Sequence, residues 1–88
     1  MYTVKQLKEQ LRAGKYAWPG GYPLYFIADD GEAMSFDAVR ENYRQVIEAI
    51  RDRDRNGWRI VGCEVNWEDA EMYCAHTGQR IESAYAEA

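Results

Sequence analysis

Residues 36–53 read FDAVRENYRQVIEAIRDR, and their apolar side chains recur at the spacing of an amphipathic helix. The apolar positions are Phe36, Val39, Tyr43, Val46, Ile47 and Ile50. The remaining positions mix both signs of charge at i, i+4 spacing, which is typical of a solvated helix face. Ser35 or Asp37 can cap the first turn. The pattern therefore predicts one long helix from Phe36 to Arg53, with one face packed on a sheet.

Strand patterns precede this helix. Residues 22–28, YPLYFIA, are rich in aromatic side chains and predict a strand that has Pro23 at its start or on an edge. Asp29-Asp30-Gly31 is a turn signal, so residues 32–35 are expected to form a short return strand. Upstream, Thr3 is a candidate N-cap and Gly14 a natural stop, which predicts a short helix over residues 4–13.

A further strand pattern follows the helix. Residues 58–67 predict a long strand in which Val61, Cys63, Val65 and Trp67 share one face. Residues 72–74 and 79–82 then resemble the two arms of a final hairpin. Together these elements predict an α+β fold: a small antiparallel sheet of about four strands, one long helix packed on it, and a short N-terminal helix.

Length and composition restrict the class of protein. A chain of 88 residues allows a single domain, residues 1–88, and its aromatic content of 14% predicts a rich core. The N-terminus lacks the apolar segment of a signal peptide, and no apolar run approaches the length of a membrane span. Two cysteines do not make the disulfide framework of a secreted protein. A cytoplasmic location without membrane contact is the expectation.

The net charge of −4 is unevenly distributed. Residues 1–63 carry ten Lys and Arg against nine Asp and Glu, whereas residues 64–88 carry one Arg against six acids. An acidic segment repels phosphates and attracts basic protein surfaces, so a protein partner with a basic surface is expected and nucleic acid is not. The candidate partner-binding residues are Trp67, Glu68, Asp69, Glu71, Glu82 and Trp18.

Residues 73–81, YCAHTGQRI, resemble the zinc knuckle of zinc-ribbon proteins, whose pattern is Cys-x-x-Cys-Gly-x-x-Ile. Cys74 and Gly78 match this pattern, but Thr77 stands where the second thiolate belongs. Ser35-Phe36-Asp37-Ala38 is the best-placed second knuckle, and it has no strong ligand. The favoured interpretation is a degenerate zinc ribbon without metal or other cofactor. A rescued site of Cys74, His76 and Cys63, or a coincidental similarity, are the alternatives.

Over most of its length the chain also resembles a family of small uncharacterised proteins found in bacteria and their phages. The shared pattern consists of residues 22–26 (YPLYF), 66–68 (NWE) and 74–85 (CxHTGxxIESAY). The resemblance implies a lineage and no activity. If it extends to phages, it favours an accessory protein or an inhibitor of a host defence protein.

No complete catalytic set is present, so an enzyme is not expected. Cys74 and His76 are two residues apart, but no third group is evident to orient them, and Cys63 is expected to be a core thiol. The preferred function is therefore a small acidic protein-binding module. The alternative is a nucleic-acid-binding descendant of a zinc ribbon that uses the helix arginines Arg40, Arg44 and Arg51. A homodimer through an exposed strand or the helix is compatible with either function.

Overall fold

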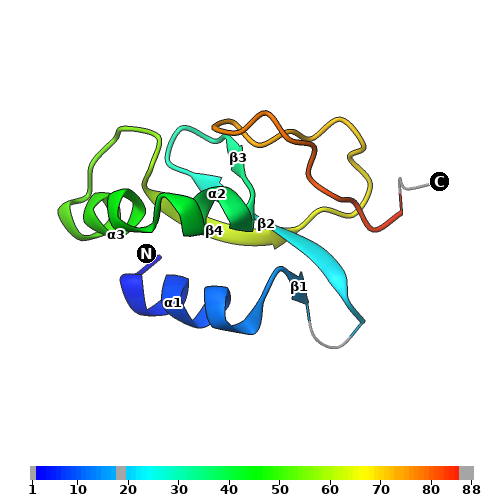
Figure 1. The fold of residues 1–88 in the computed structure, drawn as a ribbon, viewed down its shortest axis with the longest axis horizontal. Coiled ribbons are helices and arrows are strands. Elements are labelled where there is room, and N and C mark those ends of the chain that lie inside the picture. The colour runs from blue at the N-terminus through cyan, green and yellow to red at the C-terminus, as the bar shows by residue number, and fades with distance from the viewer. Residues whose placement is uncertain (1, 18–19, 86–88) are drawn as a thin grey trace.

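The computed structural model describes residues 2–17 and 20–85. Over these residues it contains three helices and four strands of an antiparallel sheet, which confirms the predicted α+β class (Figure 1). In chain order the elements are α1 (Val4–Ala13), β1 (Tyr16–Ala17), β2 (Tyr22–Ala28), β3 (Ala33–Met34), α2 (Phe36–Glu41), α3 (Tyr43–Asp52) and β4 (Ile60–Val65). None of the helices in this part of the chain has the length and apolar character needed to cross a bilayer.

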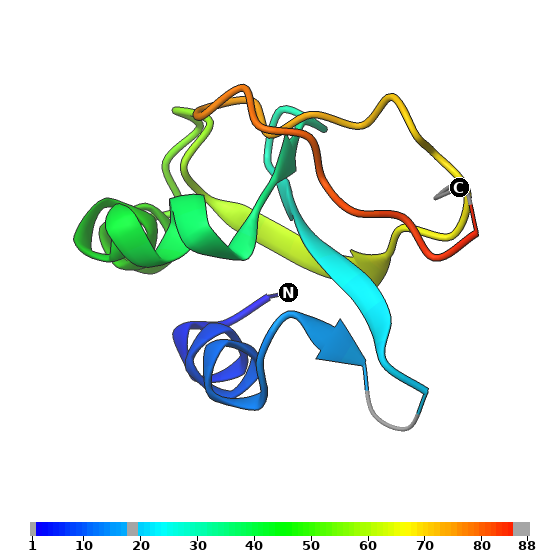
Figure 2. The ribbon, with the colours of Figure 1, turned by 45° about the vertical axis from the view of Figure 1, so that its right-hand side comes forward.

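Strand β2 is the centre of the sheet and pairs antiparallel with the other three strands. Its first residues pair with β1, and Phe26 and Ile27 pair with β3. The longest ladder joins β2 to β4, from Leu24 opposite Val65 to Ala28 opposite Ile60. Figures 1 and 2 both place α1 below the sheet and the long segment that follows β4 above it.

Helix α1 has the predicted bounds because both of its ends carry strong local signals. Thr3 and Gln6 form a capping box: the Gln6 N–H donates to the Thr3 hydroxyl over 3.1 Å, and the Thr3 N–H donates to the Gln6 side chain over 2.8 Å. Gly14 ends the helix with a φ of 98°, a backbone conformation that favours glycine. Leu7 points into the core and is fully buried.

The prediction of one long helix over residues 36–53 is wrong, since two helices, α2 and α3, meet at Asn42. Asn42 leaves the helical conformation (φ −116°, ψ 31°), and its side-chain amide donates to the carbonyl oxygen of Ala38 over 2.9 Å. Asparagine competes in this way with the backbone hydrogen bonds of a helix. The predicted N-cap at Ser35 is confirmed, because its hydroxyl accepts from the Ala38 N–H over 3.1 Å.

Strand β4 is shorter than the predicted strand and has an irregular register. Ile27 faces Gly62 while Ala28 faces Ile60, so Val61 is an extra residue on the β4 side. Consequently Ile60 is fully buried, whereas Val61 is 44% exposed and Cys63 half-buried. The predicted shared face therefore holds for Cys63 and Val65 but is wrong for Val61, and Trp67 lies beyond the end of β4.

The predicted C-terminal hairpin is present only as a single bridge between Tyr73 and Arg80. Backbone hydrogen bonds from Cys74 N to Gln79 O (2.8 Å) and from Ile81 N to Met72 O (2.8 Å) hold the two arms together. The Ala75 N–H donates to the Ala33 oxygen over 2.9 Å, which ties the turn to β3.

The core lies where β2, the helices and this C-terminal turn meet. Phe26 of β2 stacks on Phe36 of α2 with ring centroids 4.3 Å apart. The buried cluster consists of Leu7, Phe26, Ala28, Met34, Phe36, Ala38, Val39, Val46, Ile50, Ile60, Cys74 and Ile81. Because residues from both ends of the chain contribute to it, the segment after β4 is part of the folded unit.

Candidate functional site

The segment that leaves β4 is held by one buried side chain, that of Asn66, which is 2% exposed. Its amide nitrogen donates to the carbonyl oxygens of Asp69 (3.1 Å), Glu82 (3.1 Å) and Ile81 (3.5 Å), and its amide oxygen accepts from the Asp69 N–H (3.2 Å). The Asn66 N–H also donates to Pro23 of β2 over 2.9 Å. Asn66 thus joins three segments: β2, the loop after β4 and the C-terminal segment.

Next to this anchor lie three aromatic side chains from three segments, Tyr22, Trp67 and Tyr85, here called the aromatic cluster. The ring centroids are 4.7 Å apart for Tyr22 and Trp67, 5.9 Å for Trp67 and Tyr85, and 6.3 Å for Tyr22 and Tyr85. Backbone hydrogen bonds from Ala84 to Asn66 and from Tyr85 to Trp67, both 2.8 Å, place the C-terminal ring beside the indole.

The aromatic cluster is open to solvent on one side. The directions from the Trp67 ring centroid to the two tyrosine centroids form an acute angle. The distances of 4.7 and 5.9 Å from Trp67 would otherwise place the tyrosine centroids more than 6.3 Å apart. They therefore do not sandwich the indole, and Trp67 remains 48% exposed and Tyr85 63% exposed. Large aromatic side chains exposed in a group are unusual on a protein surface and are typical of binding sites.

The pKa values of two tyrosines are shifted by the groups around their hydroxyls. A hydrogen bond with the Tyr22 hydroxyl raises the pKa of Tyr85. Burial, followed by the charges of Glu64 and Asp69, raises the pKa of Tyr25 on β2. Both carboxylates therefore lie near the Tyr25 phenol on β2.

Four predicted acidic residues lie on the two segments that Asn66 joins. Glu68, Asp69 and Glu71 are exposed in the loop after β4, where the Asp69 carboxylate accepts from the Glu71 N–H over 2.9 Å and shapes the loop. Glu82 is exposed on the C-terminal segment, and its carboxylate accepts from the Tyr16 hydroxyl over 3.3 Å. The structure thus places these four residues and Trp67 on adjacent segments. Trp18, the sixth predicted residue, lies outside the described residues.

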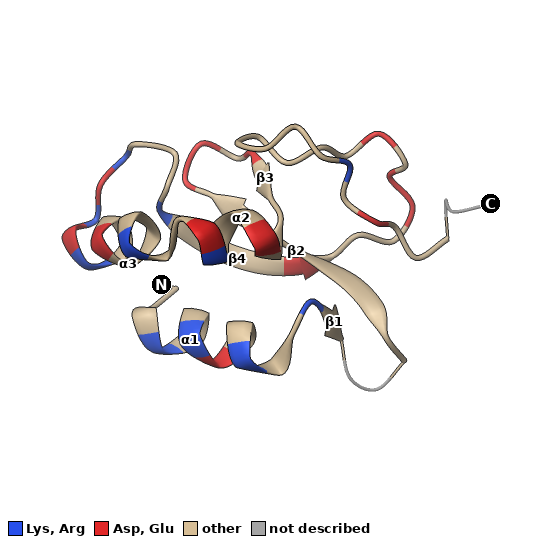
Figure 3. Ribbon diagram, viewed as in Figure 1, with Lys and Arg blue, Asp and Glu red and all other residues tan. Residues whose placement is uncertain are grey.

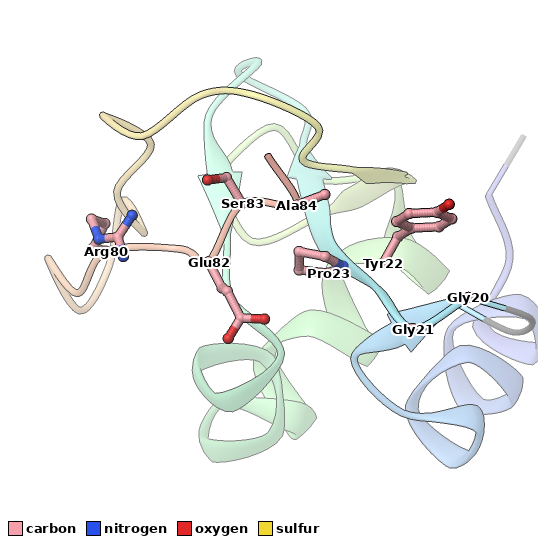
Figure 4. A pocket seen from close by; sticks show the side chains of 8 residues that line it. All are labelled: Gly20, Gly21, Tyr22, Pro23, Arg80, Glu82, Ser83 and Ala84. Atoms are coloured by element: carbon pink, nitrogen blue, oxygen red, sulfur yellow. The ribbon is translucent and has the colours of Figure 1, made fainter. Parts of the chain in front are cut away.

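An open trough of about 710 Å³ separates the start of β2 from the C-terminal segment. Figure 4 shows its lining, with Pro23 between Tyr22 and Glu82: Gly20, Gly21, Tyr22, Pro23, Arg80, Glu82, Ser83 and Ala84. A methyl group on Gly20 would come within 2.8 Å of the Tyr22 ring, so the ring rests directly against the glycine backbone. A second hollow of about 200 Å³ shares Pro23, Arg80 and Glu82 with the trough and extends it toward α2.

The basic side chains lie mainly on other elements. Figure 3 shows Lys and Arg along α1 and mixed charges on α3, whereas red predominates in the segment after β4. From Glu64 to Tyr85 the chain carries five acids and one base, Arg80. Two of the helix arginines have partners: Arg40 donates to the Leu11 carbonyl oxygen over 2.7 Å, and Arg51 pairs with Asp52 at 3.5 Å.

The two segments predicted as knuckles lie against each other, because the Ser35 N–H donates to the Cys74 sulfur over 3.4 Å. Burial of Cys74 raises its pKa, but hydrogen bonds from Ser35, from Thr77 and from the His76 backbone outweigh this effect and lower the pKa to about 7. Within residues 2–17 and 20–85 no three His, Cys, Asp or Glu side chains are arranged to hold a metal ion.

The other residues of the alternative metal site are placed elsewhere. The His76 ring stacks on Trp58 with centroids 3.9 Å apart, and its Nε2 lies 3.3 Å from the Gly57 carbonyl oxygen. Cys63 lies on β4, where burial and then the charge of Glu64 raise its pKa to about 11. Both cysteines are free thiols.

Sequence reasoning assigned no role to Asn66 or Tyr85, and it did not bring Tyr22 together with Trp67. Asn66 stands inside the NWE motif, but nothing in its neighbours predicts that its amide reaches residues 81 and 82. No protein-family model, curated protein or solved structure matches this chain. The resemblance to a bacterial and phage family therefore rests on the sequence pattern alone and stays a prediction.

Proposed function

We propose that this protein is a small protein-binding module whose contact surface combines the aromatic cluster with the acidic loop of Glu68, Asp69 and Glu71. The observation that carries the proposal is the contact of half-buried Tyr22 with the exposed rings of Trp67 and Tyr85, beside a loop to which Asn66 is hydrogen-bonded. Aromatic anchors surrounded by polar groups are typical of the centre of a protein interface. The carboxylates favour a basic partner surface.

Two observations favour a protein over a nucleic acid as the partner. The acidic loop repels phosphates, so the aromatic side chains beside it are poorly placed to stack on bases. Of the helix arginines that the nucleic-acid alternative uses, Arg40 donates to the Leu11 carbonyl oxygen, and the charge of Arg51 is offset by the adjacent Asp52 carboxylate. Whether the module acts as a monomer or a homodimer does not change this choice.

A sharper form of the proposal concerns what the acidic loop imitates. Closely spaced carboxylates resemble the charge of a phosphate backbone, so the module is suited to occupy a basic groove that otherwise binds nucleic acid. Such an accessory protein or inhibitor of a host protein would act by competition and would need no catalytic residue.

Charge reversal with a matched control tests the proposal. Glu68→Lys/Glu71→Lys changes the contact surface, and Glu41→Lys/Glu48→Lys changes exposed positions on α2 and α3 by the same total charge. Asp69 is left intact because its carboxylate shapes the loop. Each tagged variant is used to capture partners from the cells that produce the protein.

A protein retained by the wild type and by the α2/α3 variant, but lost with the loop variant, is the expected result. If both variants lose the partner equally, the interaction depends on net charge and not on this surface. Retention of the partner by the loop variant would contradict the proposal.

A further inference from the structure

We infer that the aromatic cluster and the adjoining trough recognise arginine side chains, in preference to lysine, on an extended segment of the partner. The inference rests on the proposed function and adds the chemistry of the side chain that is bound. It starts from the exposed part of Trp67, which keeps 48% of its surface open although the centroids of the two tyrosine rings lie 4.7 and 5.9 Å from its own.

An indole face attracts cations because its π electrons give it negative character, and among aromatic side chains Trp does this most strongly. Trp67 offers such a face at 48% exposure, and the Tyr85 ring lies beside it with its plane nearly parallel, at 11° and with centroids 5.9 Å apart. A flat platform of this kind matches the planar guanidinium of arginine, which stacks as well as attracts. The compact, strongly hydrated ammonium of lysine gains only the electrostatic part.

Negative charge around the platform adds to this preference. Glu68 follows Trp67 directly and is exposed, and Asp69 and Glu71 are exposed on the same loop. A carboxylate has about four lone-pair positions and can accept two parallel N–H groups from one guanidinium. An arginine stacked on Trp67 therefore has carboxylate acceptors on the adjoining loop.

The trough gives the rest of the occupant a place to lie. It runs from Tyr22 past Pro23 to Glu82, where it joins the second hollow (Figure 4). Glu82 accepts one hydrogen bond, from the Tyr16 hydroxyl, which leaves other lone pairs of its carboxylate to accept from a second basic side chain. Arg80 also lines the trough, so we assign the recognition of cations to its two ends, the aromatic cluster and Glu82.

Two capped pentapeptides of equal charge test the inference, Gly-Arg-Gly-Arg-Gly and Gly-Lys-Gly-Lys-Gly. Each is titrated into the ¹⁵N-labelled full chain at low ionic strength, and the backbone amide signals of residues 66–71 are followed by NMR in the wild type and in each variant. Trp67→Ala removes the platform, whereas Trp58→Phe changes the indole that stacks on His76 and serves as the control.

The arginine peptide is expected to bind about threefold more tightly than the lysine peptide, because its guanidinium adds stacking to the cation–π attraction that both side chains share. This difference should vanish in Trp67→Ala and persist in Trp58→Phe. Equal affinity of the two peptides would overturn the arginine preference and leave an acidic protein-binding surface, as proposed above. If neither peptide binds, the inference is overturned. The capture experiment with the charge-reversal variants then tests the proposed function separately.

Discussion

Replacing Asn66 with alanine should destabilise the whole C-terminal segment, because one buried side chain makes four hydrogen bonds there. The backbone groups of the exposed residues Asp69 and Glu82 regain water in the variant. The carbonyl oxygen of the buried residue Ile81 does not regain water, so it is left without a hydrogen-bond partner. This group accounts for most of the expected loss of stability. A buried polar group without a partner costs about 1–3 kcal/mol, and the exposed groups add smaller amounts.

We therefore expect Asn66→Ala to lower the free energy of unfolding by about 3 kcal/mol, which corresponds to a fall in Tm of roughly 12–24 °C for a domain of this size. Urea unfolding followed by circular dichroism measures the free energy. Asn56→Ala is the matched control, since its exposed side chain accepts one hydrogen bond, from the Trp58 N–H. The control should lose about 1 kcal/mol or less.

Equal destabilisation by Asn66→Ala and Asn56→Ala would refute the role of Asn66 as the anchor of the site. Asn66→Asp sharpens the comparison because it keeps the volume and the acceptor oxygen but replaces the amide donor. A carboxylate would then face the carbonyl oxygens of Asp69, Ile81 and Glu82. This variant should be at least as unstable as Asn66→Ala at neutral pH.

Three further predictions concern the core and the titrating groups. The pKa of Cys74 falls from its ordinary value of 9.0 to about 7 in the folded protein. As the pH rises from 7 to 9, the wild type should therefore gain stability over Cys74→Ala, by up to about 2 kcal/mol in urea unfolding. A constant difference in stability across this range would contradict the lowered pKa of Cys74. Ile60→Ala should cost about 2–4 kcal/mol while Val61→Ala costs under about 1 kcal/mol, and the reverse order would show that Val61 and not Ile60 faces the core. Tyr22→Phe should return the pKa of Tyr85 toward 10.0 in an ultraviolet titration, because it removes the hydroxyl that raises it, and an unchanged pKa would rule out that contact.

The elements that the sequence predicted correctly are those with local signals at their ends. Helix α1 has the capping box of Thr3 and the stop at Gly14, and strand β2 lies between the glycines before Tyr22 and the turn at Asp29. The helix over residues 36–53 was predicted as continuous because its apolar periodicity does not change at Asn42. The side chain of Asn42 interrupts it through a single hydrogen bond, which periodicity does not report.

The candidate site was predicted in its charges but not in its geometry. Trp67 and the acids around it stand close together in the sequence, so their clustering follows from the chain itself. Tyr22 meets Trp67 through the pairing of β2 with the end of β4, and Tyr85 meets it through backbone hydrogen bonds of the C-terminal segment. The irregular register of β4, which exposes Val61, lies beside Gly62; a glycine within a strand pattern can indicate a bulge, but the pairing with β2 decides which residue is extra.

Photocrosslinking from the aromatic cluster tests the central claim most directly. Benzoylphenylalanine is placed at Tyr85, which is 63% exposed in the cluster, and in a second variant at Tyr43, which is 37% exposed on α3. Irradiation of cells that produce each variant should yield one discrete crosslinked protein from position 85 and none from position 43. Crosslinking to a discrete protein only from position 43, or none from position 85, would contradict a protein-binding role for this surface.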